Sequence, residues 1–432
     1  MSINSIIEVV GGMAIFLYGM FIMSDSIQKM AGEQVKTILL KLTGGPVKGY
    51  LTGLIATCLI QASAATIIME MSFVSAGLLS FSQTLAVTMG AQLGTTITAQ
   101  LVAFKITKYA LPVITVSFFI TLFSKNNTVK NAAGLFLGFG ILFFGIDIMS
   151  KALFPLRQYP PFLKIMATVE DPLLGIGVGF LFTMITQSSS ATSGVTVAMA
   201  FAHTITLQQA IPINLGASIG TTLTPFLGSV GMNREGKRVA WGHIFTQIIG
   251  VFIVFLLLIP RIGNEAVWIL FVKWFTRTIV GTQDVARQIA MAHSLMPLAT
   301  AVVCLPLVKL ISGLLLRLFP SLETEKPFKA DFITDTVVEI PALALDLSKK
   351  EILHMCGIVD SMLKGSISLF EKKEKQLADS LSLTDIKVDI LRDTIVPFLT
   401  KVEKQGLTEK EKKTEINHIY IVNAVESIGD II

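Results

Sequence analysis

The sequence predicts an all-α integral membrane protein followed by a soluble helical bundle. Of its 432 residues, 52% are hydrophobic and only 15% are charged, whereas soluble chains usually carry about 25% charged residues. The charges are unevenly distributed. Residues 1–320 contain 20 Lys and Arg against 10 Asp and Glu, and residues 321–432 contain 15 against 20. The first part is therefore predicted to be a membrane domain, and the second an acidic soluble domain.

Seven apolar stretches in the first part are long enough, or nearly so, to cross about 30 Å of hydrocarbon as helices. They cover residues 6–28, 82–104, 109–124, 134–150, 208–230, 239–259 and 290–316. The start of the chain has no basic n-region and no A-x-A site, so we expect the first stretch to be retained. Residues 262–318 are predicted to form accessory helices, because tryptophans and basic residues interrupt the apolar pattern at their start.

The chain contains an internal repeat. When the sequence is shifted by 126 residues, residues 12–98 align with residues 138–224 without a gap, with 22 identities in 87 positions. Biased composition alone would give roughly a tenth identical positions, and many of the matches are glycine or polar rather than aliphatic. We therefore predict one repeat at about 6–125 and a second at about 132–260.

Each repeat holds a polar tip between two short apolar arms. The arms cover residues 49–60 and 67–80 in the first repeat, and residues 173–186 and 193–204 in the second. Such arms are too short to cross singly, and polar backbone at membrane depth must line a cavity or be buried in protein. The pattern predicts two re-entrant helical hairpins. Three crossings per repeat would invert the second copy, so the two hairpins would oppose each other, as in inverted-repeat secondary transporters.

The tips are rich in hydroxyl and amide groups but lack nearby basic residues. They read Gln61-Ala-Ser63-Ala-Ala-Thr66 and Gln187-Ser188-Ser189-Ser190-Ala-Thr192, and each is followed by Gly-Ala-x-x-Gly-Thr-Thr. No Lys or Arg occurs between Lys48 and Lys105, or between Lys164 and Arg234. An anion at the tips would be held by donors, helix N-termini and bound cations. This combination favours cation-coupled anion transport.

Other interpretations of these residues are weaker. Ser and Thr often bond to their own helix, and Gly-x-x-x-Gly often only packs helices, but two matching motifs favour a binding site. Glu70 is a lone acid in an apolar arm, and the sequence leaves open whether it is functional or a structural hydrogen-bonding group. We find no nucleophile elbow, phosphate loop or zinc motif, so the protein is not predicted to be an enzyme. It also lacks a basic aromatic platform for nucleic acid.

Residues 1–320 resemble the type II sodium/phosphate cotransporters, whose duplicated QSSS stretches form opposed re-entrant hairpins. The resemblance implies symport of inorganic phosphate into the cell with Na+ as the coupling ion and no organic cofactor. It also implies a multi-pass protein of the cell inner membrane and a homodimer. Ala62 and Ala64 depart from the family pattern, so the first tip is expected to make fewer contacts. The residues implied for phosphate are Gln61, Ser63, Gln187, Ser188, Ser189 and Ser190, and those for sodium are Thr66, Gln92, Thr95, Thr96, Thr192, Thr221 and Thr222.

Residues 346–432 resemble a PhoU-like helical domain, which we expect to be cytoplasmic and joined to the membrane domain by a linker at 321–345. Asp385 and Asp389, and likewise Glu426 and Asp430, lie one helical turn apart. PhoU-like domains bind metal through such pairs, although a solvated acidic face is the alternative for either pair alone. Because the chain stops within the second pair's helix, we expect a truncated or short domain.

Two further hypotheses remain open from the sequence. Hydroxyls and helix N-termini select weakly among anions, so the cargo of a symporter could also be another small oxyanion or a carboxylate. In the other hypothesis the protein is a membrane-anchored regulator, whose tail reports phosphate status to a partner.

Overall fold

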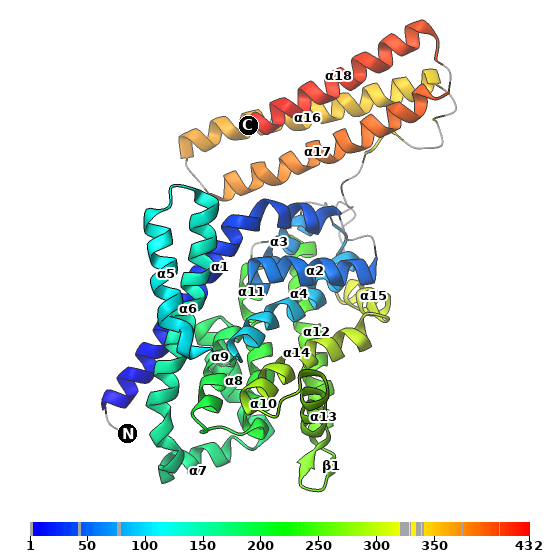
Figure 1. Cartoon of the computed structure of the whole chain (residues 1–432). Coiled ribbons are helices and arrows are strands. Elements are labelled where there is room, and N and C mark those ends of the chain that lie inside the picture. The colour runs from blue at the N-terminus through cyan, green and yellow to red at the C-terminus, as the bar shows by residue number, and fades with distance from the viewer. Residues whose placement is uncertain are drawn as a thin grey trace. The chain divides into compact units, whose positions relative to one another are not determined.

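The computed structural model consists almost entirely of helices (Figure 1). It describes residues 3–41, 45–75, 79–104, 106–230, 232–319, 328, 330–333, 338, 341–372, 375–405 and 407–432. The chain divides into two units, Met1–Met71 with Phe81–Ser321 and Ser72–Ser80 with Leu322–Ile432. Most of the linker predicted at 321–345 lies outside the described residues.

The first repeat forms five α-helices. Pro46 begins the second of them, at a position where its missing N–H costs nothing, and the fifth contains no charged residue. A short 3-10 turn, Thr107–Tyr109, precedes the fifth helix. The helices are α1 (Ile3–Lys41), α2 (Pro46–Ile60), α3 (Ser63–Ser75), α4 (Phe81–Val102) and α5 (Ala110–Phe123).

The second repeat forms seven α-helices, several of which begin at side chains that cap them. Asn126, Asp171 and Thr206 each accept hydrogen bonds from backbone N–H groups in the first turn of their helix. The helices are α6 (Asn127–Leu153), α7 (Pro160–Thr168), α8 (Pro172–Thr186), α9 (Ser189–Phe201), α10 (Leu207–Gly220), α11 (Leu223–Gly228) and α12 (Arg234–Leu258).

The accessory segment begins with a feature that the sequence analysis did not predict. Strands β1 (Arg261–Ile262) and β2 (Glu265–Ala266) form a small antiparallel hairpin, and Gly263 supplies the left-handed conformation that its turn requires. Three α-helices follow, as expected for accessory helices: α13 (Val267–Phe275), α14 (Val285–Cys304) and α15 (Val308–Leu318).

Two of the seven apolar stretches are not single helices. The stretch at 208–230 is divided between α10 and α11, with the break at Thr221 and Thr222. The stretch at 290–316 is divided between α14 and α15, which are bent by 83° next to Pro306. A proline removes a backbone donor and clashes with the preceding turn, so it commonly breaks a helix.

Several helices are long and apolar enough to cross a membrane. Among the described residues these are Ser5–Met30, Asn127–Gln158, Arg234–Leu258 and Pro341–Leu369, and the count rises from four to seven if each bent pair is one span. The first three contain the predicted stretches 6–28, 134–150 and 239–259. The protein is therefore a multi-pass membrane protein, although the fourth helix belongs to the tail and packs in a bundle there.

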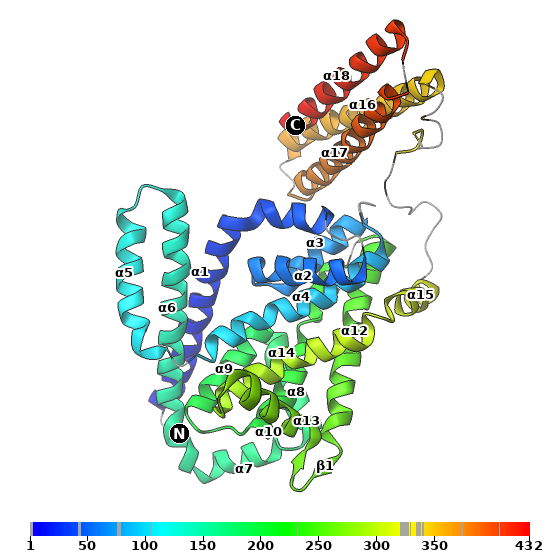
Figure 2. The same ribbon diagram turned by 45° about the vertical axis from the view of Figure 1, so that its right-hand side comes forward.

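Glycines let pairs of helices approach closely at matching places in the two repeats. In the first repeat, Gly53 of α2 faces the backbone carbonyl of Val87 on α4. In the second repeat, Gly179 of α8 faces the backbone carbonyl of Ile213 on α10, so the same contact recurs 126 residues later. Contacts between the two repeats include those of α1 with α6, and α5 also packs on α6 (Figures 1 and 2). The glycine contacts of α1 with α6 come in exchanged pairs: Gly12 with Met149 and Gly138 with Met23, and Gly19 with Leu142 and Gly145 with Phe16.

The tail is a bundle of three long helices, α16 (Pro341–Lys372), α17 (Lys375–Glu403) and α18 (Glu409–Ile431). Its core contains Met355, Leu391, Leu399 and Val422, all of which are fully buried. Thr408 caps α18 by accepting the Glu411 N–H, while the Glu411 side chain accepts the Thr408 N–H.

The glycine contacts generate a test of the close packing between α8 and α10. A Cβ at Gly179 would overlap the Ile213 carbonyl, so we expect Gly179→Ala to destabilise the protein by about 1–3 kcal/mol. Gly177→Ala is the matched control on the same helix, because a Cβ there meets nothing within 4 Å. The control should be neutral or slightly stabilising. Thermal unfolding of the purified variants is the measurement, and equal unfolding temperatures would contradict the packing argument.

Candidate functional site

Both helix hairpins reverse direction at a glutamine in the left-handed conformation. Gln61 follows α2 with φ 60°, and Gln187 follows α8 with φ 53°. Residues with a side chain adopt this conformation infrequently. The backbone N–H of each glutamine donates to a carbonyl four residues earlier, that of Thr57 or Thr183, at 2.7 Å in both turns. The same turn therefore recurs 126 residues apart.

A threonine pair joins the two arms of each hairpin behind its tip. The hydroxyls of Thr57 and Thr66 lie 2.9 Å apart, and those of Thr183 and Thr192 lie 2.5 Å apart. All four side chains are buried. Thr66 and Thr192, which the family resemblance implies for sodium, thus contact the opposite arm of their own hairpin, and neither lines the cavity between the tips.

One cavity of about 360 Å³ lies between the two tips. It brings together eight of the predicted site residues and adds several from α1. Among the residues that the structure describes, no Asp, Glu, His, Lys or Arg lines it. The lining residues are Leu17, Met20, Phe21, Ser24, Gln61, Ala62, Ser63, Ala64, Thr95, Thr186, Gln187, Ser188, Ser189, Ser190 and Thr221.

Several donors in this cavity have no partner in the described part of the chain. The hydroxyls of Ser63, Ser189 and Ser190 make no hydrogen bond there, although each residue is at most 6% exposed. The two glutamines differ. Gln61 donates to the Cys58 carbonyl at 2.6 Å and accepts from Thr98 at 2.5 Å, whereas the Gln187 amide makes no such bond. The second tip therefore offers more free donors than the first.

The N-termini of two helices also meet the cavity. α3 begins at Ser63 and α9 begins at Ser189, and both residues line the cavity. The first N–H groups of a helix lack intrahelical partners and carry partial positive charge. One of those in α9 is already satisfied, because the Ser188 hydroxyl accepts the Ala191 N–H at 3.2 Å. The remaining groups suit an anion.

The predicted sodium residues do not all lie at the cavity. Thr95 and Thr221 line it, and their hydroxyls donate to the Ala91 and Ala217 carbonyls one turn back. Besides Thr66 and Thr192, the remaining three form hydrogen bonds elsewhere, outside the cavity lining. Gln92 donates to Thr246 at 3.0 Å, Thr96 donates to the Leu93 carbonyl at 2.8 Å, and Thr222 donates to the Ile219 carbonyl at 2.8 Å.

Three residues that support the first tip were not predicted. Ser24 lines the cavity and, with Gln28, donates to the Ile60 carbonyl at the end of α2. Thr98 donates to the Gln61 side-chain oxygen. Ser24 and Thr98 are identical in the second repeat, at Ser150 and Thr224, but identity between repeats does not distinguish a residue that supports a tip from one that only packs helices.

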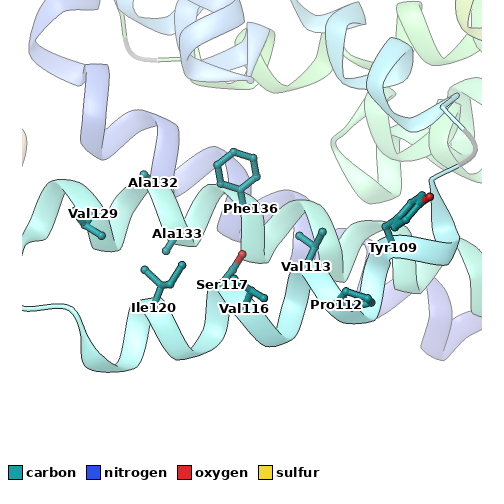
Figure 3. A pocket seen from close by; sticks show the side chains of 10 residues that line it. All are labelled: Tyr109, Pro112, Val113, Val116, Ser117, Ile120, Val129, Ala132, Ala133 and Phe136. Atoms are coloured by element: carbon teal, nitrogen blue, oxygen red, sulfur yellow. The ribbon is translucent and has the colours of Figure 1, made fainter.

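A second pocket, of about 490 Å³, lies between α5 and α6 and is apolar except for Tyr109 and Ser117 (Figure 3). Figure 3 labels the lining side chains, of which Val113 and Val116 come from α5 and Val129 and Phe136 from α6. Such a lining offers no set of polar ligands for a small ion, so the cavity between the tips is the candidate site.

The tail gathers three of its four predicted metal residues. Carboxyl oxygens of Asp389, Glu426 and Asp430 lie within 4.8 Å of one another. Asp385 is outside this set, but its charge acts on Asp389. Partial burial, with a smaller contribution from the neighbouring charges of Asp385, Asp430 and Glu426, raises the pKa of Asp389 to about 6. A divalent cation prefers such a group of carboxylates.

The described residues form a helical membrane unit with a polar cavity between two helix hairpins, and such a plan is typical of membrane proteins that handle small solutes. Residues 15–151 and 162–272 match the Na+/Pi-cotransporter family, and the chain belongs to that family. Residues 352–432 match the PhoU domain. The recognition of both parts from the sequence is thus confirmed.

Relatives cover different shares of the chain. It is 30% identical to "Uncharacterized protein YqeW" of Bacillus subtilis, over 71% of this chain and 95% of that protein. It is 22% identical to "Putative inorganic phosphate export protein YjbB" of Escherichia coli, over 99% of this chain and 77% of that protein. It is 34% identical to human "Sodium-dependent phosphate transport protein 2B", over 26% of this chain and 16% of that protein. No solved structure gives a significant match.

The carboxylate cluster gives a pH-dependent test in the tail. The folded-state pKa of Asp389 lies above the ordinary value of 3.8. The contribution of this carboxyl to stability is therefore fully present below pH 3.8 and is lost as the pH rises through about 6. We therefore expect Asp389→Asn to stabilise α17 and α18 at pH 7.5 and to have no such advantage at pH 4.

Hydrogen exchange of the full chain, compared with wild type at each pH, measures this effect. Asp346→Asn, an exposed carboxyl on α16, is the control. Added Mg2+ should protect wild type and leave Asp389→Asn unchanged. Equal exchange of wild type and Asp389→Asn at both pH values would contradict the electrostatic argument.

Proposed function

We propose that the protein is a secondary transporter that moves inorganic phosphate together with Na+, binding phosphate in the cavity between the two tips. The observation that carries this proposal is the composition of the cavity. It combines free hydroxyls and two helix N-termini, and none of its described lining residues is charged. Membership of the Na+/Pi-cotransporter family supports the same cargo.

The donors match what phosphate oxygens require. Ser63, Ser189 and Ser190 offer hydroxyls and Gln187 offers an amide, and each can donate to a phosphate oxygen. We propose that Ser188 and Gln61 mainly shape the tips, because the Ser188 hydroxyl and the Gln61 amide already hold protein groups. This division assigns more direct phosphate contacts to the second tip.

Sodium coupling follows from the electrostatics of this cavity. Phosphate carries one to two negative charges near neutral pH, and removing such an ion from water costs several kcal/mol unless it is paired. No basic side chain lines the cavity. Bound sodium ions supply the missing positive charge, and hydroxyl and carbonyl oxygens such as those around Thr95 and Thr221 are suitable ligands for a hard cation.

The exchanged glycine contacts support an inverted repeat. We call the residue 126 positions later in the chain the mate of a residue in the first repeat. If a residue i touches the mate of a residue j, a two-fold axis requires that j also touches the mate of i. Gly12 with Met149 and Gly138 with Met23 follow this rule. We infer that the axis lies in the membrane plane, so that α2–α3 and α8–α9 are re-entrant hairpins from opposite faces. Ligand sites at such an interface are typical of secondary transporters.

Direction and location complete the proposal. We propose inward transport across the cell inner membrane under an inward sodium gradient, with the PhoU domain in the cytoplasm and the chain as a homodimer. The printed names of the relatives differ on direction, since that of the Escherichia coli protein states export, and that of the human protein states sodium dependence. Coupling makes the sodium gradient the determinant of direction.

The coupling is tested in proteoliposomes. Uptake of labelled phosphate should require sodium, saturate with it and reverse when the sodium gradient is reversed, because the cavity contains no fixed positive charge. Excess sulfate or a small carboxylate competes in parallel reactions and tests the alternative cargoes. Equal uptake in potassium or choline without sodium would rule out the coupling.

The second tip is tested by removing one hydroxyl. Losing a hydrogen bond to a charged ligand costs about 1.5–3 kcal/mol, which is about tenfold to hundredfold in affinity, so Ser189→Ala should weaken phosphate binding by at least tenfold. Thr196→Val is the control on the same helix, because that hydroxyl bonds to the Ser193 carbonyl. Phosphate binding to purified protein in saturating sodium is measured. Wild-type affinity in Ser189→Ala combined with Gln187→Ala would place the site elsewhere.

A further inference from the structure

Glu70 is an acidic residue in the interior of the membrane unit. It lies on α3 and is completely buried. One of its carboxyl oxygens, Oε2, accepts a hydrogen bond from the Thr88 hydroxyl on α4 at 2.7 Å. The other oxygen, Oε1, is buried and has no donor in the described part of the chain. A buried carboxylate normally accepts several hydrogen bonds, so Glu70 is under-supplied with donors.

No basic side chain compensates for this acid. The sequence has no Lys or Arg between Lys48 and Lys105, and within the described residues no Lys, Arg or His forms an ion pair with Glu70. A buried unpaired carboxylate is costly, and in proteins such charges are paired or coordinate a metal ion. Glu70 must therefore either keep a proton or have a cationic partner, and the described side chains do not provide such a partner.

A second unsatisfied oxygen lies one helical turn from Thr88. Gln92 on α4 donates through Nε2 to Thr246 on α12, which fixes the orientation of its amide. Its Oε1 is buried and without a donor. Thr88 and Gln92 are four residues apart and share one face of α4. This face thus has an excess of oxygen acceptors, which is what a hard cation requires and what an anion would avoid.

The equivalent positions in the second repeat have the opposite character. The mate of Glu70 is Thr196, whose hydroxyl bonds to its own helix at the Ser193 carbonyl. The mate of Thr88 is Asn214, whose Oδ1 accepts from Ser193 and whose unsatisfied atom is the donor Nδ2. The excess of acceptors is therefore specific to the first repeat, and it arises from Glu70 and Gln92.

We propose that Glu70, together with Thr88 and Gln92, binds a sodium ion at a site separate from the cavity between the tips. The inference rests on the proposed function, because it assigns ligands to one of the coupling ions. Glu70 is seven residues from Ser63 on α3, which is about 10 Å along a helix. Sodium at this site neutralises the acid and joins the second arm of the first hairpin to α4, and so favours the packed arrangement of the tip.

The test is the number of sodium ions bound by the purified full chain in lipid nanodiscs, measured with radioactive sodium in the presence of phosphate. Glu70→Gln keeps the shape of the side chain and removes its charge. We expect it to bind one sodium ion fewer per chain than wild type while still binding phosphate at high sodium. Thr196→Val, at the equivalent place in the second repeat, should keep the wild-type sodium count.

Each result decides the proposal. An unchanged sodium count in folded Glu70→Gln overturns it, and so does an unchanged count accompanied only by a shifted pH dependence of uptake, which would identify a proton instead. If Glu70→Gln does not fold, Thr88→Val gives the same readout through an apparent sodium affinity at least tenfold weaker. Wild-type protein that binds sodium but neither binds nor transports phosphate would refute the proposed function, and the sodium count would still decide the role of Glu70.

Discussion

Backbone groups that leave a helix in the interior of a protein must find partners there, and both hairpin turns depend on this constraint. The left-handed glutamines meet it by donating their N–H groups to Thr57 and Thr183. At the first turn, Ser24 and Gln28 also satisfy the Ile60 carbonyl. With the turns held in this way, the free N–H groups of the following helices and their serine hydroxyls remain for a ligand. The cavity is thus a consequence of how the chain reverses direction.

The two repeats retain their packing and differ in their chemistry. Glycine contacts and threonine pairs recur 126 residues apart. At the glycines, two helix backbones approach so closely that a larger residue would block the contact. The polar residues that face the cavity or the neighbouring helices have diverged: Ala62 and Ala64 stand against Ser188 and Ser190, and Glu70 stands against Thr196. A common framework therefore carries two unequal half-sites, one rich in donors and the other in acceptors.

The sequence predicted two short helices around each glutamine, and eight of the predicted site residues line one cavity, because the motif, its repetition and the arm lengths all favoured one arrangement. Whether the hairpins are re-entrant stays a prediction. The sequence did not separate residues that face the cavity from residues that hold the turns. Thr66 and Thr192 belong to the same polar motifs as the residues that line the cavity. Their hydroxyls nevertheless contact Thr57 and Thr183 on the opposite arm of the hairpin. The breaks at Thr221 and Pro306 were also missed, because hydropathy averages over a window and does not register where a helix bends.

The lack of charge in the cavity and the buried acid beside it act together. A cavity lined with lysine or arginine would hold phosphate without help, and release would then require breaking strong ion pairs. In the proposed function the positive charge comes from ions that arrive from solution, and an ionised Glu70, which is completely buried, would add to the demand for them. Phosphate would then bind tightly only where sodium is abundant and leave where sodium is scarce. In that arrangement the coupling of the two solutes would follow from the positive charges that the lining of the cavity does not provide.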